Sequence, residues 1–225
     1  MEWTIPIQKL EVNKIQVGQL QKSLKPLTPL SYADGPIVFQ SLNLLLPPLV
    51  VKEYDSVSGK LLLNLNGDTQ TTAKLMALQD SFLQNVFVNQ KIWFPDSNRT
   101  KEQLNAFFQP FVENSTLHLY CPIQQSQVAV ASGGRGQDMR KNMISIWKDN
   151  SWKQLTTTGL IVKGESIRVA LRLQGISYQM NTNTGLWTGR FRVQHKICCI
   201  YQCVKPVVTE ILSRPKPTSA EEQKC

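Results

Sequence analysis

The chain has 225 residues, 41% of them hydrophobic and 18% charged, and a formal net charge of +9. This length and composition exclude wholesale disorder and suit one large domain or two small ones. The longest apolar run, residues 44–51, contains two prolines and is far shorter than the roughly 20 residues of a membrane-spanning helix. The N-terminus lacks the basic and apolar regions of a signal peptide. We therefore expect an intracellular protein that is neither secreted nor bound to a membrane.

The first part of the chain predicts strands separated by turns. Residues 1–30 are rich in Gln and Lys, and their scattered apolar positions fit a short strand or an extended arm. A turn at Gly35-Pro36 opens a strand-like run at 37–42, and the runs 49–54 and 60–65 flank a plausible hairpin loop. The expected organisation is an N-terminal arm at 1–30, a folded domain at 31–208 and a flexible C-terminal tail at 209–225.

Two helices are predicted in the middle of the chain. Asp68 can cap the first, whose apolar residues recur at helical spacing and which should end near Asn89. The second should run from 101 to 108 and stop before Pro110, because the residue that precedes a proline disfavours the helical conformation.

The last part of the chain predicts strands again. Strands are expected at 167–178 and 187–201. Apolar residues alternate with basic and small polar ones over 167–176 and 187–197, so each strand should have one apolar face and one basic face. The turn at 181–185 would join these two runs into a hairpin. Further strands are expected at 117–121, 143–147 and 159–162. These patterns predict a mainly β protein of the α+β class, with two helices between groups of strands.

The positive charge of the chain is concentrated in one segment. Residues 131–205 hold twelve basic and three acidic residues, and this difference equals the +9 of the whole chain. The same segment carries Trp147, Trp152, Tyr178, Trp187, Phe191 and Tyr201. Cations follow a phosphate backbone, and flat rings stack on unpaired bases. We therefore expect single-stranded nucleic acid as the partner. The alternative is a basic, solvated surface over an ordinary core.

The candidate contacts follow from these patterns. Cations on one sheet face would neutralise phosphates, while Trp152 and Tyr178, near turns in polar surroundings, would stack on bases. Trp187 alternates onto the apolar face, so it fits the core better. Core packing is also the simpler interpretation for any one of the other rings taken alone. The Gly-rich loop at 133–137 could close over the strand. The candidate nucleic-acid-binding residues are Arg135, Arg140, Lys141, Lys148, Trp152, Lys153, Arg168, Arg172, Tyr178, Arg190, Arg192 and Lys196.

The cysteines and histidines give no sign of a metal or of catalysis. His195, Cys198, Cys199 and Cys203 invite a zinc interpretation, but they lie in one apparent strand whose alternate side chains point to opposite faces. Buried thiols are the simpler interpretation. No nucleophile, carboxylate-pair or phosphate-loop motif is present in the sequence. We therefore expect no enzyme activity, no cofactor and no metal.

Five pieces of the sequence follow one another in order over roughly residues 32–203. They are Gly35–Gln40 with the Leu-rich, Pro47-containing run after it, the predicted helix that ends before Trp93-Phe94, Leu119–Pro122, Gly164–Val169 through Gly175-Ile176, and Gly185–Gln194. In pattern and spacing these pieces resemble the single-stranded DNA-binding proteins of large nucleocytoplasmic DNA viruses. The resemblance implies an OB-like β-barrel elaborated with about two helices, which coats single strands during viral replication. Members of that family often carry an acidic tail, whereas this chain ends in a nearly neutral one.

The expected function is therefore sequence-independent binding of single-stranded DNA in replication, recombination or repair. One alternative is a viral structural or assembly protein that forms a lattice through its strand edges. Another is an RNA-binding module. The expected partners are single-stranded DNA or possibly RNA, further copies of the chain and replication proteins. The expected location is the host cytoplasm or nucleus, within a viral replication compartment if the protein is viral.

Overall fold

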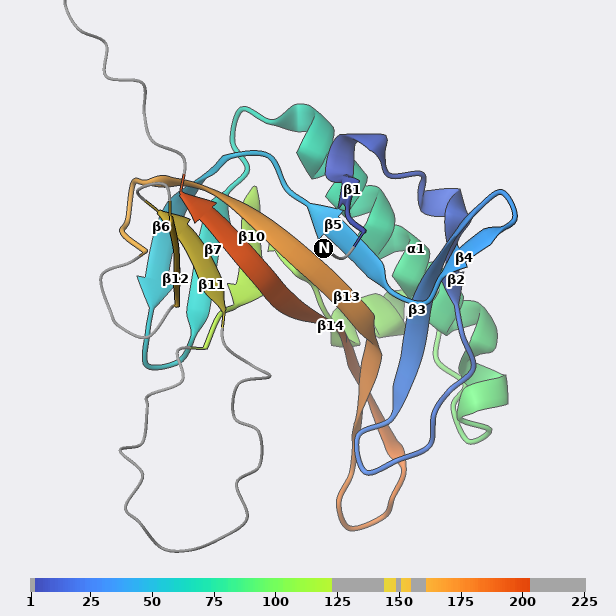
Figure 1. The fold of residues 1–225 in the computed structure, drawn as a ribbon. Helices are drawn as coiled ribbons and strands as arrows, with labels where there is room; N and C mark the ends of the chain where they lie inside the picture. The colour runs from blue at the N-terminus through green and yellow to red at the C-terminus, as the bar shows by residue number, and fades with distance from the viewer. Residues whose placement is uncertain (1–2, 123–143, 149–150, 155–160, 203–225) are drawn as a thin grey trace, which may run out of the picture.

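The computed structural model describes residues 3–122, 144–148, 151–154 and 161–202, and Figure 1 shows their arrangement. The described strands join one open sheet network, and two α-helices separate β7 from the strands that follow. The mainly β, α+β class with two helices is confirmed. The strands are β1 (Ile5–Pro6), β2 (Ile15–Val17), β3 (Leu27–Asp34), β4 (Ile37–Phe39), β5 (Leu42–Leu45), β6 (Leu49–Asp55), β7 (Lys60–Asn64), β8 (Phe108–Gln109), β9 (Val112–Glu113), β10 (Thr116–Tyr120), β11 (Ser145–Lys148), β12 (Ser151–Gln154), β13 (Ser166–Met180) and β14 (Trp187–Gln202). The helices are α1 (Thr69–Trp93) and α2 (Lys101–Phe107).

The long antiparallel hairpin of β13 and β14 forms the central ribbon of the sheet (Figure 1). The second edge of β13 pairs in turn with β6, β5 and β3. A bulge between Leu173 and Gly175 lies where β13 passes from β5 to β3. A side chain at Gly175 would collide with the carbonyl oxygen of Thr28, so the close approach of β3 requires glycine there.

The sheet curls but does not close into a barrel among the described residues. From β14 the order runs through β13, β6 and β7 to β10. The edge of β14 that faces away from β13 pairs with β11 at one end and with β8 at the other. β10 therefore approaches β14 without a backbone ladder, and the backbone N–H of Tyr120 donates to Nε2 of His195 at 2.8 Å. The barrel expected from the resemblance is corrected to an open, curled sheet.

The first helix is longer than the sequence predicts. Asp68 caps it as expected by accepting a hydrogen bond from the backbone of the first turn. The helix passes the predicted end near Asn89 because Gln90 and Trp93 continue its buried stripe. α2 matches the predicted range 101–108 to within one residue. No helix among the described residues is long and apolar enough to cross a membrane.

The N-terminal segment packs onto the body of the protein. Ile5, Ile7 and Leu10 are buried in the main core, and β1 pairs in parallel with β5. The segment expected as an arm thus supplies core side chains in this structure. The tail expected at 209–225 lies outside the described residues.

Candidate nucleic-acid interface

The predicted basic side chains share one face of the central ribbon, which we call the basic face. Arg172 lies directly opposite Lys196 in the pairing of β13 with β14, and alternation along β14 places Arg190 and Arg192 on the same side. Arg168 begins the face at the other end of the ribbon. The prediction that these cations share a face is confirmed. The basic face consists of Arg168, Arg172, Arg190, Arg192 and Lys196.

Three cations of the basic face have no carboxylate partner among the described residues. Arg168, Arg190 and Arg192 are exposed and form no ion pair with any described residue. Nε of Arg172 donates to Oδ1 of Asn43 at 3.2 Å, which helps to orient the guanidinium. Asn43 belongs to β5, so the neighbouring strand fixes this part of the face. The surface can therefore attract a polyanion.

An aromatic row lies at one end of the basic face, defined by Trp152, Trp147 and Tyr201. In the strand register Trp152 is opposite Trp147, Trp147 is opposite Tyr201, and Tyr201 is opposite Arg168. The ring of Trp152 meets those of Trp147 and Tyr201 edge to face, with centroids 5.2 and 5.3 Å away. Trp152 is 50% exposed, so part of its ring is open to solvent. The row lies next to Arg168, which is opposite Tyr201 in the register.

A groove lies at the other end, between the ribbon and the end of α2 with β8, which follows it directly. Its volume is about 880 Å³, and we call it the basic groove. Lys25, Arg190 and Arg192 supply its charge, and Phe107 and Phe108 supply an apolar wall. The ring of Phe108 stacks on that of Phe191 with centroids 5.0 Å apart. No acidic side chain is present among the described residues that line it.

Tyr178 is the predicted site residue that the structure contradicts. Its side chain is only 5% exposed, and its hydroxyl is 3.1 Å from Oγ1 of Thr28. Burial raises the pKa of this phenol above its usual range. The cause is the bulge between Leu173 and Gly175, which changes the parity of the strand and turns Tyr178 into the core. Tyr178 therefore has no ring face to offer a base.

Some predicted contacts are outside what the structure describes. Arg135, Arg140 and Lys141 fall in the undescribed range 123–143, together with the loop at 133–137. Lys148 and Lys153 belong to β11 and β12, opposite Ser151 and Ile146 in the register, and their side chains are not described.

Other functional candidates were missed by the sequence reasoning. Lys25 and Phe107 come from segments far from the charged stretch, so only the tertiary fold brings them to the basic groove. Tyr201 was visible as an aromatic residue near the end of the last strand. Its position opposite Trp147 depends on the parallel pairing of β11 with β14, which no local sequence pattern predicts. Trp187, expected in the core, is buried as predicted.

His195 is held as a neutral, structural side chain. Burial, with the charge of Arg192 nearby, lowers its pKa to about 4, and its Nε2 accepts the Tyr120 N–H. Burial also raises the pKa of the Cys198 and Cys199 thiols. Among the described residues no three His, Cys, Asp or Glu side chains come close enough to hold a metal ion, and Cys203 is outside them.

The aromatic row, the basic face and the basic groove follow one another along the ribbon. From Tyr201 to Arg190 on β14 the path is about 36 Å at the usual strand rise. Such a path offers cations for phosphates and rings for bases, which are the contacts a single strand can use. Comparisons of the chain with protein-family models, with curated proteins and with solved structures find no match.

Proposed function

We propose that this protein binds single-stranded DNA without sequence preference and coats it during replication, recombination or repair. The observation that carries the proposal is the unbroken sequence of aromatic row, basic face and basic groove along one ribbon. The resemblance of the sequence to viral single-stranded DNA-binding proteins supports the same activity and suggests a viral setting.

The spacing of the cations favours one phosphate backbone over two. Arg190 and Arg192 are two residues apart on β14, and Lys196 follows four residues later. Alternate residues of a strand stand about 7 Å apart, so these cations form a single file. A single strand lying along this file would have its bases free to reach Trp152.

The chemistry of the site explains the lack of sequence preference. Guanidinium and ammonium groups contact phosphates, which are identical in every nucleotide. Every base has a ring face, so stacking contributes about 1–3 kcal/mol for each base regardless of identity. A duplex keeps its bases stacked inside and can use only the charges, so it should bind more weakly.

The test is fluorescence anisotropy with labelled oligo-dT and the matching duplex, over several salt concentrations. Tight, salt-dependent binding to the single strand with weak binding to duplex supports the proposal. Equal or absent binding to both contradicts it, and salt-insensitive self-association without DNA would favour the lattice alternative. Oligo-U in place of oligo-dT tests the RNA alternative, because a site that uses the 2′-hydroxyl distinguishes the two.

The matched variants are two double substitutions. Arg168→Ala with Arg190→Ala removes one cation from each end of the basic face. Lys9→Ala with Lys91→Ala removes two exposed charges from the N-terminal segment and from α1. We expect only the first pair to weaken binding, while both proteins keep the wild-type unfolding temperature.

A further inference from the structure

One aromatic ring in the basic groove is open to solvent. Phe107, the last residue of α2, lines the groove and is 39% exposed. The other described rings of the groove are closed off, because Phe108 is half-buried against Phe191, and Phe191 and Tyr178 are 2% and 5% exposed. Burial excludes Tyr178 as a base contact, whereas Phe107 keeps ring surface available to a ligand.

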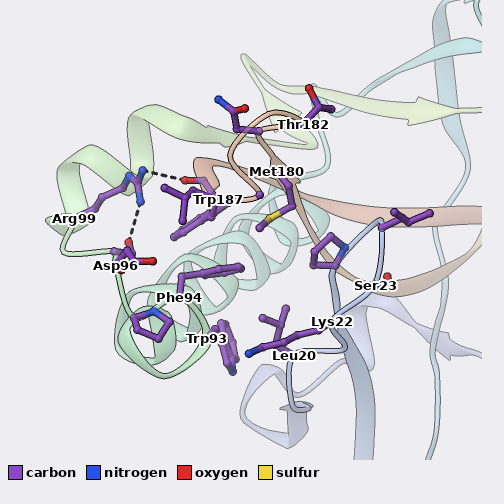
Figure 2. Close-up of a pocket in the computed structure, with 17 residues that line it drawn as sticks. Leu20, Lys22, Ser23, Trp93, Phe94, Asp96, Arg99, Met180, Thr182 and Trp187 are labelled. Atoms are coloured by element: carbon purple, nitrogen blue, oxygen red, sulfur yellow. Dashed lines mark hydrogen bonds between the residues drawn. The ribbon is translucent and has the colours of Figure 1, made fainter.

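Arg99 holds Phe107 in place. The Arg99 guanidinium lies over the Phe107 ring, 5.9 Å from its centre. Figure 2 shows the same guanidinium beside Trp187, where it donates to the Trp187 carbonyl at 3.4 Å and to Oγ of Ser97 at 2.9 Å. Gly189 leaves room for this packing, because a side chain there would meet both Arg99 and Phe107. The ring is therefore positioned by the fold before any ligand binds.

Cations surround this exposed ring. Lys25, Arg190 and Arg192 line the same groove, are exposed, and form no ion pair with any described residue. β8 follows Phe107 directly and pairs in parallel with β14 at Phe191, so the ring lies beside the cations of the ribbon. The described lining holds no carboxylate. A flat ring among cations suits a base that is joined to phosphates.

The basic groove also carries neutral groups that suit any base. Gln109, Gln179 and Gln194 line it and are exposed. Each of these side-chain amides has both donors and an acceptor, so it can turn to match the edge of whichever base is present. Such amides add polar contacts without selecting a sequence, in keeping with the proposed function.

Phe107 and Trp152 lie at opposite ends of the ribbon. Trp152 packs against Tyr201, and Phe107 lines the groove with Arg190. The stretch of β14 from Tyr201 to Arg190 is about 36 Å at the usual strand rise. Phosphates of a stacked strand stand about 3.4 Å apart, so about 11 nucleotides cover this stretch, and a drawn-out strand covers it with fewer. Four nucleotides span only about 27 Å even at twice that spacing.

We propose that a base stacks on Phe107 in the basic groove while a second base of the same strand stacks on Trp152. This inference rests on the proposed function and adds to it a second base contact and a minimum length of strand. Lys25 and Arg190 hold the phosphates next to the base at Phe107. Strands of about 11 nucleotides reach both rings, whereas strands of about four reach one ring at a time.

The first test compares oligo-dT at the two limits of usual single-strand sites, about 4 and 16 nucleotides, by competition in fluorescence anisotropy. Phe107→Leu keeps an apolar side chain and removes the flat ring. Phe87→Leu is the matched control, because Phe87 is 36% exposed on α1 and does not line the groove.

We expect Phe107→Leu to weaken binding of the longer strand about 5- to 150-fold, which is the loss of one stacked base. Binding of the shorter strand should change less than about twofold, because it can bind at the aromatic row instead. The control should bind both strands as wild type does. Unchanged binding of the longer strand by folded Phe107→Leu, or an equal loss in the control, would overturn the inference.

Photo-crosslinking of the wild-type protein is the second test, and it decides the question if Phe107→Leu does not fold. Single thymines of the longer strand are replaced in turn by 5-iodouracil, and the crosslinked residues are mapped by mass spectrometry. We expect crosslinks to Phe107 from one end of the strand and to Trp152 from the other. Crosslinks to Trp152 with none to Phe107 would overturn the inference and leave the proposed function standing. Failure of the strand to bind at all would overturn the proposed function itself.

Discussion

Removing Arg168 and Arg190 together should change the salt dependence of DNA binding by a defined amount. The basic face supplies five cations, of which these two are exposed and without an ion pair among the described residues. For single strands the slope of log K against log salt is about −0.7 for each neutralised phosphate. Five contacts then give a slope of about −3.5, and three give about −2.1.

These slopes translate into measurable affinities. Between 50 and 200 mM salt, a slope of −3.5 weakens binding about 130-fold, whereas a slope of −2.1 weakens it only about 18-fold. Contacts from residues outside the described part of the chain would steepen both slopes equally, so the difference of about 1.4 is the quantity to compare. Anisotropy titrations with oligo-dT at four salt concentrations resolve it.

The result that would refute the reasoning is a folded double variant with the wild-type slope. The basic face would then be a solvated surface, and phosphate contacts would lie elsewhere. The control pair Lys9→Ala with Lys91→Ala must keep the wild-type slope, because neither residue belongs to the ribbon or lines the basic groove. A control slope that falls by the same amount would show that the effect follows net charge alone.

Three further predictions concern single side chains. Trp152→Ala should cost about 1–3 kcal/mol of oligo-dT binding with an unchanged salt slope, and a change of slope instead would argue against stacking. The pKa of His195 is lowered to about 4, so its contribution to stability is complete above pH 6.5 and is lost as the pH falls toward 4. In urea titrations wild type should lose up to roughly 3 kcal/mol of unfolding free energy over that range relative to His195→Gln, whose amide can still accept the Tyr120 N–H; parallel curves would contradict the assignment. Lys196→Gln should weaken oligo-dT binding and make the slope of log K against log salt shallower by about 0.7, because one phosphate contact is lost; a folded variant with the wild-type slope would show that Lys196 does not contact the strand.

The basic face was predictable because it depends on local periodicity. In β14 outward-facing and inward-facing residues alternate without interruption from Arg190 to Lys196, as predicted. The predicted turn at 181–185 does join the two strands. The expectation for Tyr178, which came from its polar surroundings near a turn, failed because the extra residue at the bulge places Tyr178 on the buried face of β13. Bulge positions depend on the partner strand, here β3 at Gly175, and a single strand's pattern does not carry that information.

The remaining features depend on contacts between distant segments. The aromatic row needs the parallel pairing of β11 with β14, which joins residues more than fifty positions apart. The basic groove needs Lys25 and Phe107 beside the ribbon, and the open sheet results from β8 and β11 occupying the edge that β10 would need. Each of these is settled by the packing of the whole chain.

The placement of the charge separates a binding surface from a merely soluble one. Outside residues 131–205 the chain has thirteen basic and thirteen acidic residues, so its other surfaces reach solubility with balanced charge. On the ribbon, by contrast, Arg168, Arg190 and Arg192 are exposed and form no ion pair with any described residue. Charge that served solubility alone could be spread over every surface, including the exposed side of α1. Cations gathered on one face of one ribbon instead give the phosphates of a single strand one continuous place to bind.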